Sequence, residues 1–188
     1  MTVADSALEA CIALLAGWIV IGIAGLARAG SIGYVGRVLF PLGAVIGATL
    51  AVVAGTSLHL PAETVTLLIG LPDLPFHLRA DALSRVFLVL LGAVASGVSI
   101  FAAGYFRKGE GTAPGILGLQ YHLFLASMGF VLLADDAYGF MVAWETMALS
   151  SYFLVTAQHG IPEIRSAGFL YLLIAHLGAI SILLCFGI

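Results

Sequence analysis

Three titratable side chains, Glu145, His176 and His122, lie inside long apolar stretches of the chain. A carboxylate deep in a membrane is costly, and such residues mark ion or proton paths. Burial favours the neutral form of the Glu145 carboxyl, whereas a nearby cation favours its charged form. A carboxyl that is subject to both effects can take up and release a proton. Imidazole carries protons in either direction near neutral pH. The residue types therefore indicate proton transfer within a membrane.

The three side chains are predicted to lie at similar depth. At 1.5 Å per helical residue, Glu145 is about 12 Å, His176 about 16 Å and His122 about 18 Å from the outer ends of their helices. Consecutive helices are usually neighbours, so the carboxyl and one or two imidazoles could form a relay. The alternative is a protonated structural acid, with histidines that hydrogen-bond between helices. The face of the helix that carries Glu145 has small and hydroxyl-bearing members: Ala148, Leu149, Tyr152 and Thr156.

The composition of the chain indicates that these side chains lie on helices that span a membrane. Of the 188 residues, 62% are hydrophobic and only 9% are charged, whereas soluble domains carry about 25% charged residues. We therefore expect an all-α integral membrane protein with one transmembrane region, residues 1–188. Six runs have about the 20 residues that cross a bilayer. They cover about 10–27, 38–58, 86–106, 115–134, 137–158 and 167–187, with a long outer loop at 59–85.

The basic residues predict the orientation. Five of them fall in one set of loops, and Arg79 and Arg85 fall in the other. The first set holds Arg28, Arg37, Arg107, Lys108 and Arg165. Since positive loops stay in the cytoplasm, we expect a multi-pass protein of the inner (cytoplasmic) membrane with its N-terminus outside.

Other classes of site are not indicated. The bases are scattered and the net charge is −3, so we expect no nucleic-acid partner. No phosphate-binding loop or metal-ligand pattern is present in the sequence, and we expect no cofactor, no metal and no catalytic centre on this chain. In the long outer loop, two prolines precede an alternation of Phe76, Leu78 and Ala80, which predicts a turn and then a short extended segment. Asp81 to Ser84 is a plausible helix start.

Residues 140–155 closely resemble the fifth-helix signature of the antiporter-like proton-translocating subunits, which occur in respiratory complex I, multisubunit sodium/proton antiporters and membrane-bound hydrogenases. The specific core is Trp144, Glu145, Met147, Leu149, Ser151 and Tyr152. Residues 76–84 look like the family segment that leads into the third helix. The stretches 150–155 and 167–179 are most similar to the hydrogenase-4 component B and formate hydrogenlyase branch.

The resemblance implies the N-terminal part of an antiporter-like helical bundle, with Glu145 as the acid of a proton path. In the family, a lysine on a later helix modulates this acid, and no such lysine is present inside the apolar runs here. We therefore expect a fragment of a longer subunit. Its implied partners are other membrane subunits and peripheral redox subunits that carry the electron-transfer centres.

Three functions remain open from the sequence. The first is a segment of a proton-translocating subunit in an oxidoreductase complex of the hydrogenase-4, formate hydrogenlyase or NADH-quinone oxidoreductase type. The second is a subunit of a multisubunit cation/proton antiporter without a redox partner. The third is a non-conducting structural remnant that only contacts its partners.

Overall fold

The computed structural model describes residues 6–71, 74–105 and 111–187. Within these ranges the chain forms six long helices and one β-hairpin. The long helices are α1 (Ala7–Leu26), α3 (Phe40–Thr56), α4 (Ala82–Tyr105), α5 (Pro114–Leu133), α6 (Ala137–Val155) and α7 (Pro162–Phe186). The predicted helices are therefore present, and a strand pair is added to them.

A short helical segment leads into α3. It consists of α2 (Ile32–Tyr34) and one π-helical turn, η1 (Val35–Leu39). Pro41 follows in the first turn of α3. Because proline has no N–H and its ring crowds the carbonyl four residues before it, a wider turn at this point accommodates Pro41 without breaking the helix. Residues Ile32–Thr56 thus form one continuous span of 25 residues.

Five helical segments of the described residues are long and apolar enough to cross a membrane. They are α1, the segment Ile32–Thr56, α4, α5 and α7. The chain is therefore a multi-pass membrane protein. The predicted span around Glu145, helix α6, has 19 residues but is not among these five.

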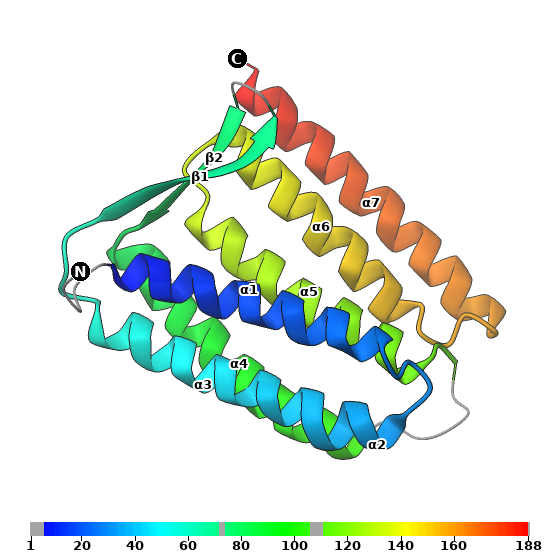
Figure 1. The fold of residues 1–188 in the computed structure, drawn as a ribbon. Helices are drawn as coiled ribbons and strands as arrows, with labels where there is room; N and C mark the ends of the chain where they lie inside the picture. The colour runs from blue at the N-terminus through cyan, green and yellow to red at the C-terminus, as the bar shows by residue number, and fades with distance from the viewer. Residues whose placement is uncertain (1–5, 72–73, 106–110, 188) are drawn as a thin grey trace.

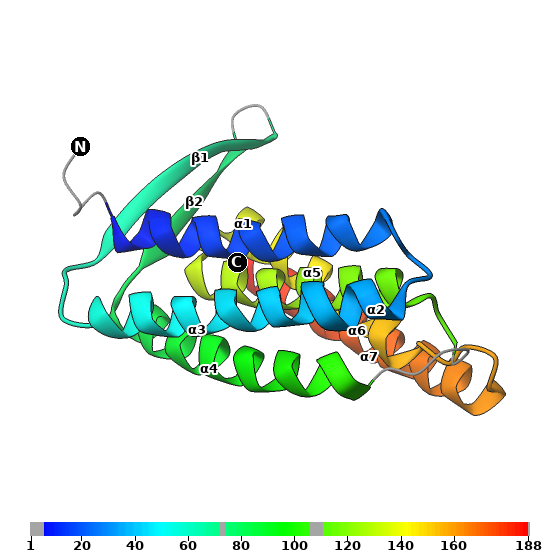
Figure 2. The ribbon, with the colours of Figure 1, turned by 60° about the horizontal axis from the view of Figure 1, so that its bottom comes forward.

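The long helices lie side by side and alternate in direction, with α7 at one edge (Figure 1). Figure 2 shows α1 and α3 on one side of the bundle. Close packing of α3 on α4 depends on glycine, since a Cβ on Gly92 would lie 2.5 Å from the Gly47 carbonyl oxygen. The buried indole of Trp18 donates a 3.0 Å hydrogen bond to the Gly43 carbonyl and joins α1 to α3. Helix α7 is covered least, and Gly168 and Ala179 are its buried residues.

The long outer loop contains an antiparallel hairpin, β1 (Glu63–Leu71) and β2 (Leu74–Ala80). The extended segment predicted around Phe76 to Ala80 is confirmed as β2, but its partner β1 was not predicted. Figure 1 shows the hairpin running from the start of α1 and α4 towards the start of α6. We call this end of the bundle the hairpin end, and the opposite end, where the loop before α7 lies, the Arg165 end.

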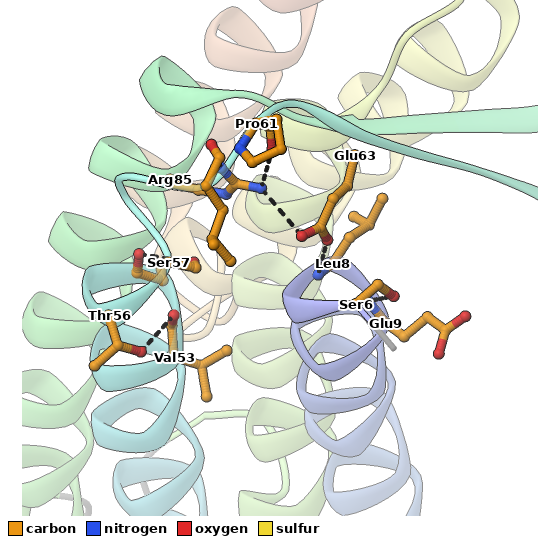
Figure 3. A network of polar contacts seen from close by, with 11 residues as sticks. Ser6, Leu8, Glu9, Val53, Thr56, Ser57, Pro61, Glu63 and Arg85 are labelled. Carbon is orange, nitrogen blue, oxygen red and sulfur yellow. Dashed lines mark hydrogen bonds and ion pairs between the residues drawn. The ribbon is translucent and has the colours of Figure 1, made fainter. Parts of the chain in front are cut away.

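Arg85 holds the base of the hairpin (Figure 3). The sequence placed it in the outer loop, but α4 begins at Ala82, so Arg85 lies in its first turn with 1% of the side chain exposed. Its guanidinium donates to the carbonyls of Leu60 at 2.6 Å and Pro61 at 2.9 Å, and lies 3.5 Å from a Glu63 carboxylate oxygen. The other Glu63 oxygen accepts the Leu8 N–H at 2.9 Å. This cluster therefore joins α4, β1 and the start of α1.

The second strand is held at the start of α6. The His77 carbonyl accepts the Asp135 N–H at 2.9 Å, and the His77 N–H donates to the Asp136 carboxylate at 2.8 Å. Asp136 also caps α6 by accepting the Gly139 N–H at 2.6 Å. Burial works to raise the pKa of Asp136, but hydrogen bonds from the N–H groups of Gly139 and His77 outweigh it, so the pKa lies below its ordinary value. The hairpin thus fixes the end of the helix that carries Glu145.

The described basic residues keep the predicted separation. Arg28 and Arg165 lie in or beside loops at the Arg165 end, whereas Arg79 and Arg85 lie at the hairpin end. Arg37, which was expected in a loop, lies instead in the π-helical turn η1, near the start of the span Ile32–Thr56. Arg107 and Lys108, which the orientation argument also used, lie outside the described residues.

Candidate site between helices α5, α6 and α7

Glu145 lies near the middle of α6 and faces a hollow between three helices. The hollow has a volume of about 300 Å³, which is room for several water molecules. Its lining residues are Gln120, Leu123, Glu145, Thr146, Leu149, Ser150, Phe153 and His176. Of the four residues predicted to share the Glu145 face, Leu149 lines this hollow.

His176 on α7 faces Glu145. Its Nε2 atom lies 3.7 Å from Glu145 Oε2, and the two side chains are 52% and 41% exposed. Its Nδ1 atom lies 2.9 Å from the Leu172 carbonyl oxygen. Since a carbonyl can only accept, Nδ1 carries the hydrogen, and in the neutral ring Nε2 is the free acceptor. The proton-accepting atom of His176 therefore points at the carboxyl.

The hydroxyl groups of the hollow present acceptor oxygens. Thr146 donates its hydroxyl hydrogen to the Val142 carbonyl at 2.7 Å, and Ser150 donates to the Thr146 carbonyl. Such bonds to the preceding turn use the hydrogen and leave the oxygen lone pairs open. Water in the hollow can therefore donate to Thr146 and Ser150 as well as to Glu145.

His122 does not join the pair. It is fully buried, its Nδ1 atom lies 2.7 Å from the Gly118 carbonyl oxygen, and its ring packs 5.8 Å from Phe40. A Cβ on Gly43 would lie 2.5 Å from His122 Nε2, so the imidazole fills the space that this glycine leaves. Gln120 and His122 are two residues apart, about 200° around a helix, so they occupy opposite faces of α5. The structure brings His176, but not His122, to Glu145.

Gln120 was not singled out from the sequence. It lies on α5, lines the hollow and belongs to a predicted membrane span. Amide side chains inside membrane helices often form contacts between helices. The position of Gln120 in an apolar run is therefore the sequence feature that could have predicted its place in the hollow. Among the described residues, no group of three or more His, Cys, Asp or Glu side chains could hold a metal ion.

The fold and the pair define the class: a multi-pass helical membrane protein with an acid and an imidazole facing each other between its helices. No family model matches the chain. Over 109 residues the chain is 37% identical to hydrogenase-4 component B of Escherichia coli. The matched stretch is 58% of this chain and 16% of that protein. It is also 33% identical over 92 residues to NADH-quinone oxidoreductase subunit L of Mycobacterium tuberculosis. That matched stretch is 49% of this chain and 14% of that protein.

A third relative is the putative antiporter subunit mnhA2 of Staphylococcus aureus, 25% identical over 114 residues, which is 61% of this chain and 14% of that protein. The resemblance to the antiporter-like subunits that the sequence indicated is thereby confirmed. The matched stretches are 14 to 16% of the length of these relatives.

Proposed function

We propose that this chain is part of a proton-translocating membrane subunit, and that Glu145 and His176 exchange a proton within it. The observation that carries the proposal is the 3.7 Å contact between Glu145 Oε2 and His176 Nε2 in a hollow between α5, α6 and α7. The similarity to hydrogenase-4 component B and to NADH-quinone oxidoreductase subunit L supports an oxidoreductase complex as the assembly.

The exchange is a transfer between two defined atoms. A protonated Glu145 gives its Oε2 proton to the free Nε2 atom of His176, which leaves a carboxylate beside an imidazolium. At 3.7 Å the atoms are beyond hydrogen-bond distance. The step therefore requires a closer approach or one bridging water, and both side chains are exposed enough for either. The step moves one proton within the pair and leaves the net charge of the pair unchanged.

We further propose how the helices and the N-terminus lie relative to the membrane. Helix α6 is taken as a sixth span, because it lies between α5 and α7, which are both apolar enough to cross. The Arg165 end faces the cytoplasm and the N-terminus lies outside, as the basic residues predict. The membrane is the inner (cytoplasmic) membrane. The partners are other membrane subunits together with peripheral redox subunits, which hold the electron-transfer centres.

A second candidate is a subunit of a multisubunit cation/proton antiporter, which the similarity to the putative antiporter subunit mnhA2 favours. In that case no electron donor is needed, and proton movement in vesicles depends on sodium. A chain that only contacts its partners is the third outcome, and it predicts no effect of changing Glu145.

The test is proton translocation by native membranes that carry Glu145→Gln. Loss of a positioned acid–base group costs about a hundredfold or more in rate, so we expect translocation to fall to about 1% or less with normal assembly. Glu163→Gln at the exposed start of α7 is the matched control and should change nothing. We also expect His176→Ala to reduce translocation more than His122→Ala. Unchanged pumping in a normally expressed Glu145→Gln variant would refute the proposal.

A further inference from the structure

Helix α7 packs on α6 in one alignment along its length. The two helices are antiparallel neighbours (Figure 1). Near the Arg165 end, the methyl group of Thr156 occupies the place that a Cβ on Gly168 would need. Near the hairpin end, the rings of Phe140 and Phe186 lie 5.8 Å apart in an edge-to-face arrangement. The carboxyl and the imidazole of the candidate site lie between these two contacts, so the same alignment brings them to one level.

A hydrogen bond between two hydroxyl groups also joins these helices. The hydroxyl of Ser151 on α6 donates to the Ala148 carbonyl at 2.9 Å. Because that bond uses its hydrogen, the hydroxyl of Tyr171 on α7 is the donor in the bond to Ser151. Ser151 lies six residues after Glu145, about 9 Å along α6, and Tyr171 lies five residues before His176, about 8 Å along α7. A shift of α7 by one turn, about 5.4 Å, would break the bond.

The rest of α7 does little to set this alignment. Its buried residues are a glycine and an alanine, and most of its large apolar side chains are exposed. Lipid chains are as apolar as these side chains, so hydrogen bonds and close packing, more than apolar burial, align helices in a membrane. Among the residues that the structure describes, the polar side-chain contacts between α6 and α7 are the Ser151–Tyr171 bond and the Glu145–His176 pair. The pair is too long for a hydrogen bond at 3.7 Å, so the hydroxyl bond is the polar contact that can hold the alignment.

We propose that Tyr171 is a positioning residue for the proton exchange, because its hydrogen bond to Ser151 holds α7 in the alignment that sets His176 opposite Glu145. Without this bond, α7 would also occupy alignments one turn away. An apolar side chain four residues before or after His176 would then face the carboxyl. The role in proton exchange rests on the proposed function, whereas the alignment of the helices does not.

Crosslinking measures the alignment without any proton movement. A cysteine replaces Glu145 in a background without the native thiols Cys11 and Cys185. In three separate variants a second cysteine is placed on α7, at positions one turn apart: Leu172, His176 or Ile180. Native membranes are treated with a short bifunctional methanethiosulfonate, and the crosslinked fraction of each variant is measured by mass spectrometry.

We expect the crosslink to form at His176→Cys in preference to the two apolar positions. Adding Tyr171→Phe should lower this preference about threefold, the worth of one hydrogen bond between membrane helices. Ser151→Ala should do the same, and the two changes together should be no worse than either alone. Ser151→Thr, which keeps a hydroxyl, should retain the preference. Tyr138→Phe is the matched control, because the Tyr138 ring packs on Phe76 of the hairpin.

An unchanged preference in both Tyr171→Phe and Ser151→Ala would overturn the proposal. With Glu145 and His176 in place, Tyr171→Phe should lower proton translocation by about threefold at most, and Ser151→Thr should leave it intact. The expected loss of preference together with full pumping by Glu145→Gln would uphold the alignment and reject the proposed function. An unchanged preference together with loss of pumping in Glu145→Gln would do the reverse.

Discussion

Replacing Arg85 by methionine tests the cluster at the base of the hairpin. Methionine keeps the apolar stem of the side chain and removes the guanidinium, which is fully enclosed between Leu60, Pro61 and Glu63. Glu63 would then keep its charge and its bond from the Leu8 N–H, but would lose its cation. The start of α1, the hairpin and the start of α4 would be joined less firmly.

The size of the effect follows from burial. Removing one partner of a buried ion pair costs about 3–5 kcal/mol, because the other charge is left unpaired. Glu63 is 22% exposed, so water compensates part of this loss and the lower figure applies. For a protein of this size each kcal/mol lowers the melting temperature by about 2–4 °C, so we expect a fall of about 6–12 °C.

The assay is thermal unfolding of the protein purified in detergent, followed by tryptophan fluorescence. Arg79→Met is the control, because its pair with Asp135 spans 3.9 Å between half-exposed side chains and such pairs are worth about 1 kcal/mol at most. Combining Arg85→Met with Glu63→Gln should recover part of the loss, since no unpaired charge remains. Equal melting temperatures for Arg85→Met and Arg79→Met would refute the reasoning.

Two further predictions concern helix packing and acid stability. Gly92→Ala should lower the free energy of unfolding by about 1–3 kcal/mol, because its Cβ would meet the backbone at Gly47. Gly97→Ala on the same helix meets nothing within 4 Å and should be neutral or slightly stabilising, as denaturant titration would show. Asp136→Ala should cost about 1 kcal/mol at neutral pH through loss of the α6 cap. The pKa of Asp136 lies below its ordinary 3.8, so its contribution is complete above that pH and is lost as pH falls through the lowered pKa; melting curves of parent and variant should converge in acid.

The helices could be predicted because each contains a long apolar run, but their starts could not be placed well. The sixth was expected from residue 167, whereas α7 begins at Pro162. Glu163 and Arg165 interrupt the apolar run without interrupting the backbone hydrogen bonds. The apolar run before α4 was expected to begin at residue 86, but the helix start expected at Asp81 to Ser84 is confirmed, because α4 begins at Ala82 and Asp81 accepts the Ser84 N–H at 2.8 Å. Polar residues in a first turn reach solvent or buried partners, so hydropathy alone misplaces such boundaries.

The pairing of the hairpin strands and the direction in which the two histidines face could not be predicted from the sequence. Strand β1 pairs with β2, which follows it after a turn. Strand β2 is in turn hydrogen-bonded to Asp135 and Asp136, which lie more than 50 residues later in the sequence. Depth along a helix follows from residue counting and placed Glu145 and His176 at comparable levels. Rotation about the helix axis does not follow from counting when a helix is apolar all round. For that reason His122 could be expected near Glu145 although it lies on another face of α5.

The hairpin also has a mechanical consequence. One end of it is bonded to the starts of α1 and α4 through Glu63 and Arg85, and its second strand is bonded to the start of α6 through His77 and Asp136. It acts as a strut across one end of the bundle. The position of the start of α6 relative to the start of α1 therefore depends on hydrogen bonds between residues that are 55 and 59 positions apart in sequence.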